Sequence, residues 1–148
     1  KINMNILQQI QSELKAPKGQ KNNFGNYSYR SAEDILTAVK PLLEKHKVSL
    51  IISDDIVGVE GRVYVQATAT LWSGDKDCEP LASSTGFARE ALTKKGMDDA
   101  QITGSASSYA RKYALNGLFA IDDTKDPDAT NDHGSKLPKP TTKQSQGF

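Results

Sequence analysis

The sequence predicts an α+β domain in which helices pack on one face of a three-stranded antiparallel sheet. Residues 62–72 alternate between aliphatic or small side chains and polar or aromatic ones, the period-2 pattern of a half-buried strand. Residues 48–57 are rich in Val and Ile, and the glycines that bound segment 58–61 predict a turn joining the two strands as a hairpin. Alanines recur every four residues within 105–116, which allows a helix there to lie close to the sheet.

The first part of the chain contributes two predicted helices and a loop between them. Apolar residues at helical spacing predict a helix over 4–14. A second helix opens at Ser31, with Asp34 three residues on in a near-capping-box arrangement, and we expect Pro41 to kink or split it. Residues 15–30 mix cationic, aromatic and Asn or Gly residues without a period, so we expect a loop.

The second part completes the sheet and supplies the last helix. Residues 81–88 predict a third, weaker strand, and 89–102 a charged connection. The last helix spans 105–116 and is expected to stop at its closing Asn-Gly pair. The element order is therefore α-β-β-β-α, with a β-β-β-α core, within a single domain over 1–123. The polar composition of 124–148 predicts a flexible tail or linker.

Composition excludes several classes of protein. Hydrophobic residues make up 36% of the chain, and no run approaches the roughly 18 apolar residues of a membrane helix. The polar, amphipathic N-terminus predicts no secretory signal. Cys78 alone forms no internal disulfide, and with only His46 and His133 the chain lacks the ligands of a Cys/His zinc site. We expect a protein of the reducing cytoplasm, without a metal or other cofactor.

The formal net charge of +1 hides an uneven distribution along the chain. Residues 1–48 hold eight Lys or Arg against four Asp or Glu. Residues 49–121 hold seven against nine, and residues 122–148 hold four against five. This balance differs from that of a histone-like protein, but it permits a local positive groove, which is what binding a phosphate backbone requires.

The last predicted helix carries residue types that suit single-stranded nucleic acid. Hydroxyl and cationic side chains lie four residues apart, which predicts that they share one exposed side beside a pair of tyrosines. Cations bind phosphate oxygens, and aromatic rings stack on unpaired bases. The alternative is an amphipathic helix with buried tyrosines and a solvated charged side. The residues concerned are Ser107, Ser108, Tyr109, Arg111, Lys112 and Tyr113.

Three other segments place cations beside polar or aromatic residues. The loop over 15–30 holds three Lys, one Arg, one Phe and two Tyr, and its alternative is a solvated loop whose tyrosines pack on the core. The polar face of the strand over 62–72 either extends a basic platform or is an ordinary polar surface. The cations of the connection over 89–102 either clamp a phosphate backbone or are solvated. These last two sets are Arg62, Tyr64 and Gln66 on the strand, and Lys94 and Lys95 in the connection.

The pattern does not favour an enzyme. Adjacent residues of a strand point to opposite faces, so Asp54–Asp55 is a poor metal dyad. The pairs Asp98–Asp99 and Asp122–Asp123 have no third carboxylate or histidine at a recognisable spacing for a two-metal nuclease. A phosphate-binding Gly-rich loop is absent from the sequence, which argues against ATP-driven strand exchange. The serines of the last helix lack a nearby histidine to act as a base.

Three segments together match a known signature. The longest is SSYARKYALNGLFAIDD at 107–123, preceded by GMDDAQITG at 96–104 and, earlier, by YSYRSAEDI at 27–35 with the helix that follows it. These segments resemble the ERF (essential recombination function) family of single-strand annealing proteins of phages and prophages. The resemblance covers roughly residues 4–126 and leaves the tail uncovered.

The resemblance implies a recombinase without ATPase activity that binds single-stranded DNA and pairs complementary strands in the cytoplasm of a bacterial host. It implies an antiparallel β-β-β-α core and homo-oligomeric rings or helical filaments. Cations would contact phosphates, and tyrosines would stack on bases or brace the helix. The residues so implied are Arg111, Lys112, Tyr109, Tyr113, Ser108, Arg30, Tyr27, Tyr29, Arg89, Lys94 and Lys95.

The alternatives are a passive single-strand binder that protects DNA without pairing it, a metal-dependent nuclease, and a protein–protein adaptor. A host single-strand-binding protein or nuclease is a candidate partner. Annealing itself would be physical rather than covalent, and the near-neutral charge predicts few bound phosphates per subunit, hence cooperation among many subunits.

Overall fold

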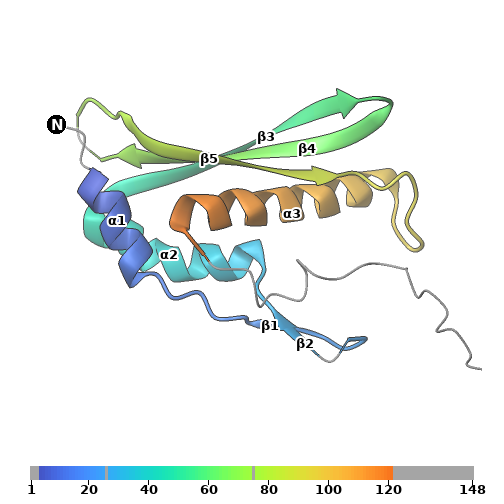
Figure 1. Cartoon of the computed structure of the whole chain (residues 1–148), viewed down its shortest axis with the longest axis horizontal. Coiled ribbons are helices and arrows are strands. Elements are labelled where there is room, and N and C mark those ends of the chain that lie inside the picture. Colours follow the sequence, from blue (N-terminus) through green and yellow to red (C-terminus); the bar gives the residue numbers. More distant parts are fainter. Residues whose placement is uncertain (1–3, 26, 75, 122–148) are drawn as a thin grey trace, which may run out of the picture.

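The computed structural model describes residues 4–25, 27–74 and 76–121, which form three helices and two antiparallel sheets (Figure 1). The larger sheet has the strand order β3-β4-β5, and β1 pairs with β2 in a separate small sheet. The predicted α+β fold with a three-stranded antiparallel sheet is thus confirmed. The elements are α1 (Met4–Glu13), β1 (Gln20–Asn22), β2 (Tyr27–Tyr29), α2 (Ala32–His46), β3 (Val48–Val59), β4 (Arg62–Ser73), β5 (Pro80–Arg89) and α3 (Asp99–Phe119).

The elements are stacked in layers. In Figure 1 the β3–β5 sheet lies at the top, α3 runs along its lower face, and α1, α2 and the β1–β2 hairpin lie below. The helices therefore share one side of the sheet, as predicted, with α3 packed mainly on β4 and β5. The predicted tail over 124–148 and the domain boundary at 123 lie outside the described residues. Largest among the fully buried side chains are Ile10, Ile35, Val39, Val65, Leu71, Leu115 and Phe119.

The β3–β4 hairpin follows the predicted alternation. Val65 and Leu71 mark the buried face of β4, with exposures of 1% and 0%. The turn is shorter than predicted, because β3 continues through Val59 and only Glu60 and Gly61 connect the strands. Both turn residues have positive φ, 50° and 75°, the backbone shape that matches the right-handed twist of the flanking strands.

The helix α3 is longer than predicted at both ends. It begins at Asp99 because Asp98 forms a capping box with Gln101, in which each side chain accepts a hydrogen bond from the other residue's backbone N–H. The predicted stop at Asn116-Gly117 is wrong, since the helix continues to Phe119. Gly117 has another function: a Cβ at this position would lie 2.4 Å from the Ser84 hydroxyl of β5.

Small residues hold α3 against β5. Ala106, Ala110 and Ala114 are almost completely buried, which confirms the predicted contact of an alanine stripe with the sheet. On the strand, a Cβ at Gly86 would lie 2.4 Å from the Ala110 carbonyl oxygen and 2.5 Å from the Ala114 backbone nitrogen. The two backbones therefore meet at Gly86 as closely as backbone atoms permit.

The segment before α2 is more ordered than the predicted loop. It contains β1 and β2, whose three residues each are too few to show a period in the sequence. The Asn22 side-chain oxygen accepts hydrogen bonds from the Phe24 and Gly25 N–H groups, which supports the turn. The prediction of a loop over 15–30 is thus wrong for the two strands, Gln20–Asn22 and Tyr27–Tyr29.

The helix α2 has the predicted start. Ser31 is its N-cap, and Ser31 and Asp34 form a complete capping box. Partial burial opposes ionisation of Asp34, but hydrogen bonds from Ser31 and Gln20 outweigh it and hold the pKa of this carboxyl below its ordinary value. The helix continues through Pro41 to His46, so the expected split does not occur.

An ion-pair cluster ties α1 to α2. The Lys45 ammonium donates to Glu13 at 2.8 Å, and His46 Nε2 lies 3.3 Å from the second carboxylate oxygen. The hydrogen bond from Lys45 is the main reason that the pKa of Glu13 is lowered, with His46 contributing less. None of the helices in the described part of the chain is long and apolar enough to cross a membrane.

Gly86→Ala should destabilise the fold, because the new methyl group would press on backbone atoms of α3 that cannot rotate away. We expect a loss of roughly 1–3 kcal/mol, the usual cost of overpacking. The matched control is Gly104→Ala in α3, where a Cβ would meet nothing within 4 Å and better helix propensity should stabilise by about 0.5–1 kcal/mol. Urea unfolding measures both, and equal effects of the two changes would contradict the packing described above.

Candidate nucleic-acid interface

The residues predicted on α3 lie on different sides of the helix. A helix turns by about 100° per residue, so Tyr109 and Arg111 point in nearly opposite directions across its axis. Arg111 and Ser107 contact β3, whereas Tyr109 and Tyr113 face the end of β5. Lys112 is only 3% exposed. Ser107 and Arg111 do share one side, as predicted, but the prediction of one exposed side that also carries Lys112 is wrong.

Asp54 of β3 holds the Arg111 side of the helix. Its carboxylate accepts a hydrogen bond from Ser107 Oγ at 2.5 Å and from Arg111 Nε and Nη2, each at 3.2 Å at closest. The ion pair is partly solvated, with side-chain exposures of 41% for Arg111 and 25% for Asp54. Arg111 thus connects α3 to an edge strand that the helix backbone does not approach closely.

The sequence contained a signal for this pair. Asp54 shares its strand face with Leu50 and Ile52, the face that packs toward the helices. A carboxylate on that face requires a cation or several hydrogen-bond donors. The prediction for Asp54 considered only a metal site shared with its neighbour and so missed its partner.

The opposite side of α3 borders a cleft that we call the β5–α3 cleft. It lies between the end of β5, the connection after that strand and the first half of α3, and encloses about 400 Å³. Buried Ile102 and Ala106 form its apolar base, while the cations and aromatic rings are exposed. Its charged and aromatic lining residues are Phe87, Arg89, Lys94, Tyr109 and Tyr113.

Four of these five residues, all except Phe87, were predicted to bind DNA. Arg89 and Lys94 come from the predicted connection, and the two tyrosines come from the last predicted helix. The structure brings them to one place because the capping box at Asp98 turns the chain from the connection into α3 beside β5. The Tyr109 and Tyr113 rings lie 6.4 Å apart at an interplanar angle of 37°, and both are more than a third exposed. The alternative that these tyrosines are buried is thus wrong.

A smaller hollow adjoins the cleft at Tyr109, which lines both. It encloses about 170 Å³ and is also lined by Tyr29, Arg30, Ser108 and Lys112. The Lys112 ammonium lies 6.0 Å from the centre of the Tyr29 ring, within cation–π range. Arg30 is held in place by a 2.6 Å hydrogen bond from its Nε to the Ala16 carbonyl. Glu33 is the acidic member of this lining.

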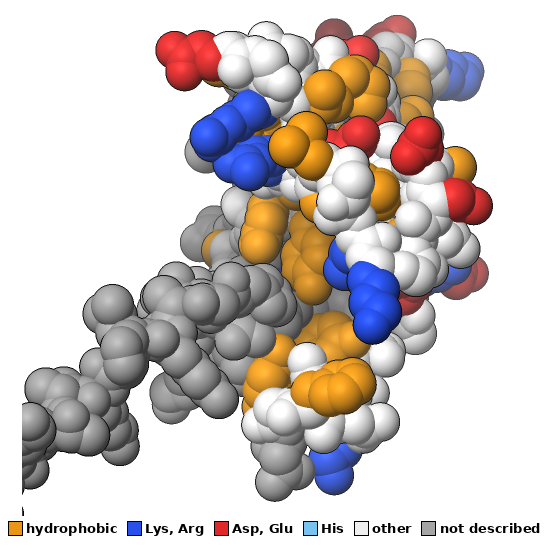
Figure 2. Space-filling model, turned by 90° about the vertical axis from the view of Figure 1, so that its right-hand side faces the viewer, with side chains coloured by type: hydrophobic (Ala, Val, Ile, Leu, Met, Phe, Trp, Pro, Cys, Tyr) orange, Lys and Arg blue, Asp and Glu red, His pale blue; other side chains and the backbone are white. Residues whose placement is uncertain are grey.

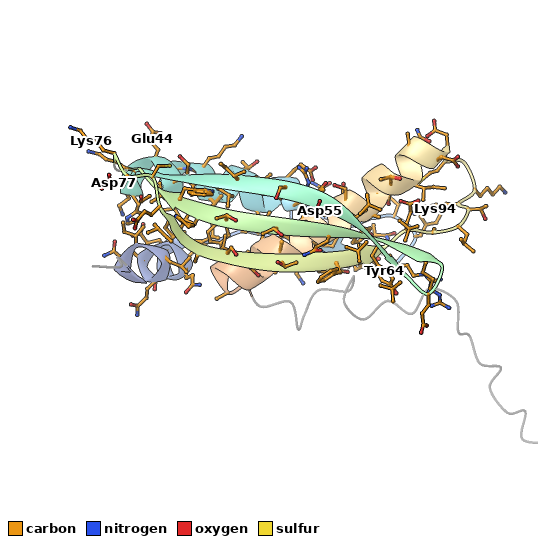
Figure 3. All side chains as sticks on the ribbon, turned by 90° about the horizontal axis from the view of Figure 1, so that it is seen from above. Glu44, Asp55, Tyr64, Lys76, Asp77 and Lys94 are labelled. Carbon is orange, nitrogen blue, oxygen red and sulfur yellow. The ribbon has the colours of Figure 1, made fainter. Side chains whose placement is uncertain are left out.

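The surface around these hollows combines apolar and cationic groups. Figure 2 shows the right-hand face of the molecule in Figure 1, where hydrophobic side chains gather along the middle and Lys or Arg side chains flank them. Acidic side chains are concentrated toward the upper and right-hand parts of this face. In Figure 3, Lys94 lies at one end of the sheet and Lys76 at the other.

Several predicted residues lie outside the two hollows. Tyr27 accepts a hydrogen bond from Asn22 Nδ2 and packs edge-on against Tyr29 at 6.3 Å. Lys95 is exposed but lines neither hollow. Arg62, Tyr64 and Gln66 share the sheet face that points away from α3, as their alternation predicted.

Phe87 is the lining residue that sequence reasoning missed. It lies in the predicted third strand and is 52% exposed, because it pairs with Gln66 and shares the sheet face that points away from α3. The signal available was the alternation along the strand, which places Phe87 on the opposite face from Gly86, the residue that meets α3.

Among residues 4–25, 27–74 and 76–121, no three His, Cys, Asp or Glu side chains gather in a way that could hold a metal ion. The pair Asp122–Asp123, a candidate in the nuclease alternative, lies outside these residues. The arrangement that the structure does present is an aromatic and cationic cleft suited to stacking and phosphate binding.

A double-mutant cycle tests the Asp54–Arg111 pair. Asp54→Asn and Arg111→Gln should each lower stability, and their coupling energy should be about 0.3–1 kcal/mol, since the pair is partly solvated. Chemical denaturation of the four proteins measures it. Additive effects would show that the two side chains do not interact in solution.

Comparison with known proteins agrees with the segments described above. The ERF superfamily profile matches residues 4–147. Over 140 residues the chain is 52% identical to the essential recombination function protein of Salmonella phage P22, an alignment that covers 95% of this chain and 65% of that relative. No solved structure matches the chain. Because the family profile covers almost its whole length, the chain belongs to the ERF superfamily.

Proposed function

We propose that this chain binds single-stranded DNA and anneals complementary strands, without ATP, in phage-type homologous recombination. The observation that carries the proposal is the β5–α3 cleft, where Arg89 and Lys94 lie beside Tyr109 and Tyr113. Cations next to exposed aromatic rings are the features that bind single strands with little sequence preference. The name of the P22 relative, an essential recombination function protein, supports the recombination context.

The proposed mechanism is physical. Arg89 and Lys94 neutralise phosphates, and the tyrosines stack on base faces, so that the strand is held extended with its pairing edges outward. A strand held in this way forms no hairpins, and a second strand can test its complementarity at once. Pairing is then downhill by about 1.4 kcal/mol for each stacked step, so no nucleotide hydrolysis is required.

The predicted residues contribute in different ways to this proposal. Lys112, Tyr29 and Arg30 shape the smaller hollow, which extends the DNA path beyond Tyr109. Arg111 serves mainly to hold α3 on β3 through Asp54. Direct binding of phosphates is therefore assigned first to the exposed pair, Arg89 and Lys94.

We also propose that the chain acts as a homo-oligomer, in a ring or helical filament. In the described part of the chain, β3 and β5 form the two outer edges of the larger sheet. Long edges with exposed apolar side chains, here Ile51 and Ile56 at 55% and 61%, are surfaces on which other strands add. Pairing of two different edges is head-to-tail, which generates rings or filaments. A host single-strand-binding protein or nuclease is the further partner proposed, in the host cytoplasm.

Annealing of two labelled complementary oligonucleotides, with EDTA and without ATP, tests the function. The wild type should accelerate pairing, and Arg89→Gln/Lys94→Gln should lose most of that acceleration, because two phosphates are no longer neutralised. In strand binding, the slope of log K against log salt should fall by roughly 0.7 for each phosphate that is no longer bound. The matched control, Lys40→Gln/Lys76→Gln, removes the same charge from exposed positions outside the cleft and should behave as the wild type.

Each contrary result has a distinct meaning. Tight binding without acceleration by the wild type would identify a passive single-strand binder. Loss of full-length oligonucleotide on adding magnesium would support a nuclease. No affinity for single strands at moderate salt would favour the protein–protein adaptor. Equal losses of annealing rate in both double variants would show that DNA does not bind in the cleft.

A further inference from the structure

We propose that Phe24, at the tip of the β1–β2 hairpin, stacks on a base of the bound single strand and makes this hairpin a third part of the DNA path. The inference rests on the function proposed above and extends it to an element beyond the two hollows. Phe24 lines neither of them, and its side chain is not part of the hydrophobic core.

The exposure of Phe24 is the first argument. Its relative exposure is 103%, the highest of any large hydrophobic side chain in the described part of the chain. The same domain buries Phe119 to 1%, so a phenyl ring has a place in its core. A ring held in water gives up the free energy that its burial would release, and this indicates a partner that covers it.

The second argument is that the turn carrying Phe24 is held by hydrogen bonds. The Asn22 side-chain oxygen accepts from the Phe24 N–H at 2.8 Å and from the Gly25 N–H at 3.2 Å. The amide nitrogen of the same side chain donates to the Tyr27 hydroxyl at 2.9 Å, across the strand pair that joins Asn22 to Tyr27. The Phe24 backbone is thus positioned before DNA binds, which lowers the entropic cost of ordering its ring on a base.

Aromatic rings connect this tip with the β5–α3 cleft, which is the third argument. Tyr27 and Tyr29 share one face of the hairpin, and their rings pack edge-on at 6.3 Å. Tyr29 lines the smaller hollow together with Tyr109, and Tyr109 also lines the cleft. In Figure 1 the hairpin projects below α2 toward the end of the molecule where α3 begins. A strand that leaves the cleft over Tyr109 and Tyr29 is therefore led to Phe24.

The charge of the hairpin segment indicates the chemistry of the partner. Residues 15–30 include four Lys or Arg and no Asp or Glu. The Asp34 carboxylate accepts a hydrogen bond from Gln20, at the end of β1 away from the tip. An apolar protein surface would match the phenyl ring but not these cations. A single-stranded nucleic acid matches both, because it combines phosphates with exposed base faces.

Stacking at the tip would favour single strands and still permit pairing. In duplex DNA the neighbouring bases already cover the faces of each base, so Phe24 would find nothing to stack on. In a bound single strand the ring covers one face of a base, while the edge that forms Watson–Crick hydrogen bonds stays accessible to a second strand.

The test compares affinities for a thymidine oligonucleotide and for an abasic oligonucleotide of equal length and charge, at one salt concentration. Phe24→Ala should weaken binding of the thymidine strand by roughly 5- to 100-fold, the range for loss of one stacked base, and should leave binding of the abasic strand unchanged. Phe24→Leu keeps an apolar side chain without a ring and should also lose affinity, whereas Phe24→Trp should retain it. The matched control is Val59→Ala, since Val59 is 52% exposed beside the turn of the β3–β4 hairpin, and it should behave as the wild type.

The Phe24→Trp protein gives a second readout. Its tryptophan emission should be quenched when the thymidine strand binds, because the indole stacks on a base, and should not change with the abasic strand. Val59→Trp is the matched probe and should show no quenching with either strand.

Two results would overturn the inference. One is a Phe24→Ala protein, folded by circular dichroism, that binds the thymidine strand as tightly as the wild type. The other is an equal loss of affinity for both strands, accompanied by a change of oligomeric state in sedimentation, which would assign Phe24 to a contact between copies of the chain. Failure of the wild type to bind either strand would instead contradict the proposed function on which the inference depends.

Discussion

The close contact between α3 and β5 determines most of what this molecule presents to its surroundings. Gly86 and Gly117 allow the strand and the helix to approach to backbone distance, and the alanines of α3 leave no side chain between them. This contact fixes the rotation of α3 about its axis. Tyr109 and Tyr113 therefore border the cleft, whereas Arg111 reaches Asp54 on the other side. A bulkier residue at Gly86 would alter both sides together.

The distribution of charge follows from the same geometry. Arg111 is neutralised by Asp54, and Lys112 is almost completely buried, so the cations that the cleft offers to a ligand are few. In the proposed function, stacking must supply a large share of the affinity for each subunit, and assembly of many subunits the rest. This fits a chain whose formal net charge is only +1.

The sheet and its helical cover could be predicted because alternation along β4 and the alanine stripe of α3 are strong periodic signals. The start of α3 was missed although Asp98 with Gln101 three residues on is a capping-box pattern, because the charged residues around it were interpreted as a connection. The four-residue spacing of Ser107 and Arg111 correctly predicts that they share one side of α3. It does not determine which element that side contacts, which is β3 at Asp54. Phe87 escaped prediction because the third strand gave only a weak signal, and the face on which this side chain lies follows from its pairing with Gln66.

The most direct test of the central proposal, that single-stranded DNA lies in the β5–α3 cleft, is photocrosslinking with an oligonucleotide that carries photoreactive bases, followed by mass spectrometry of the peptides. We predict crosslinks to peptides that contain Phe87–Lys94 and Tyr109–Tyr113, competed away by unlabelled single strand and not by duplex. Crosslinks confined to β3, around Ile51–Ile56, would contradict the proposal, because that edge lies on the far side of α3 from the cleft.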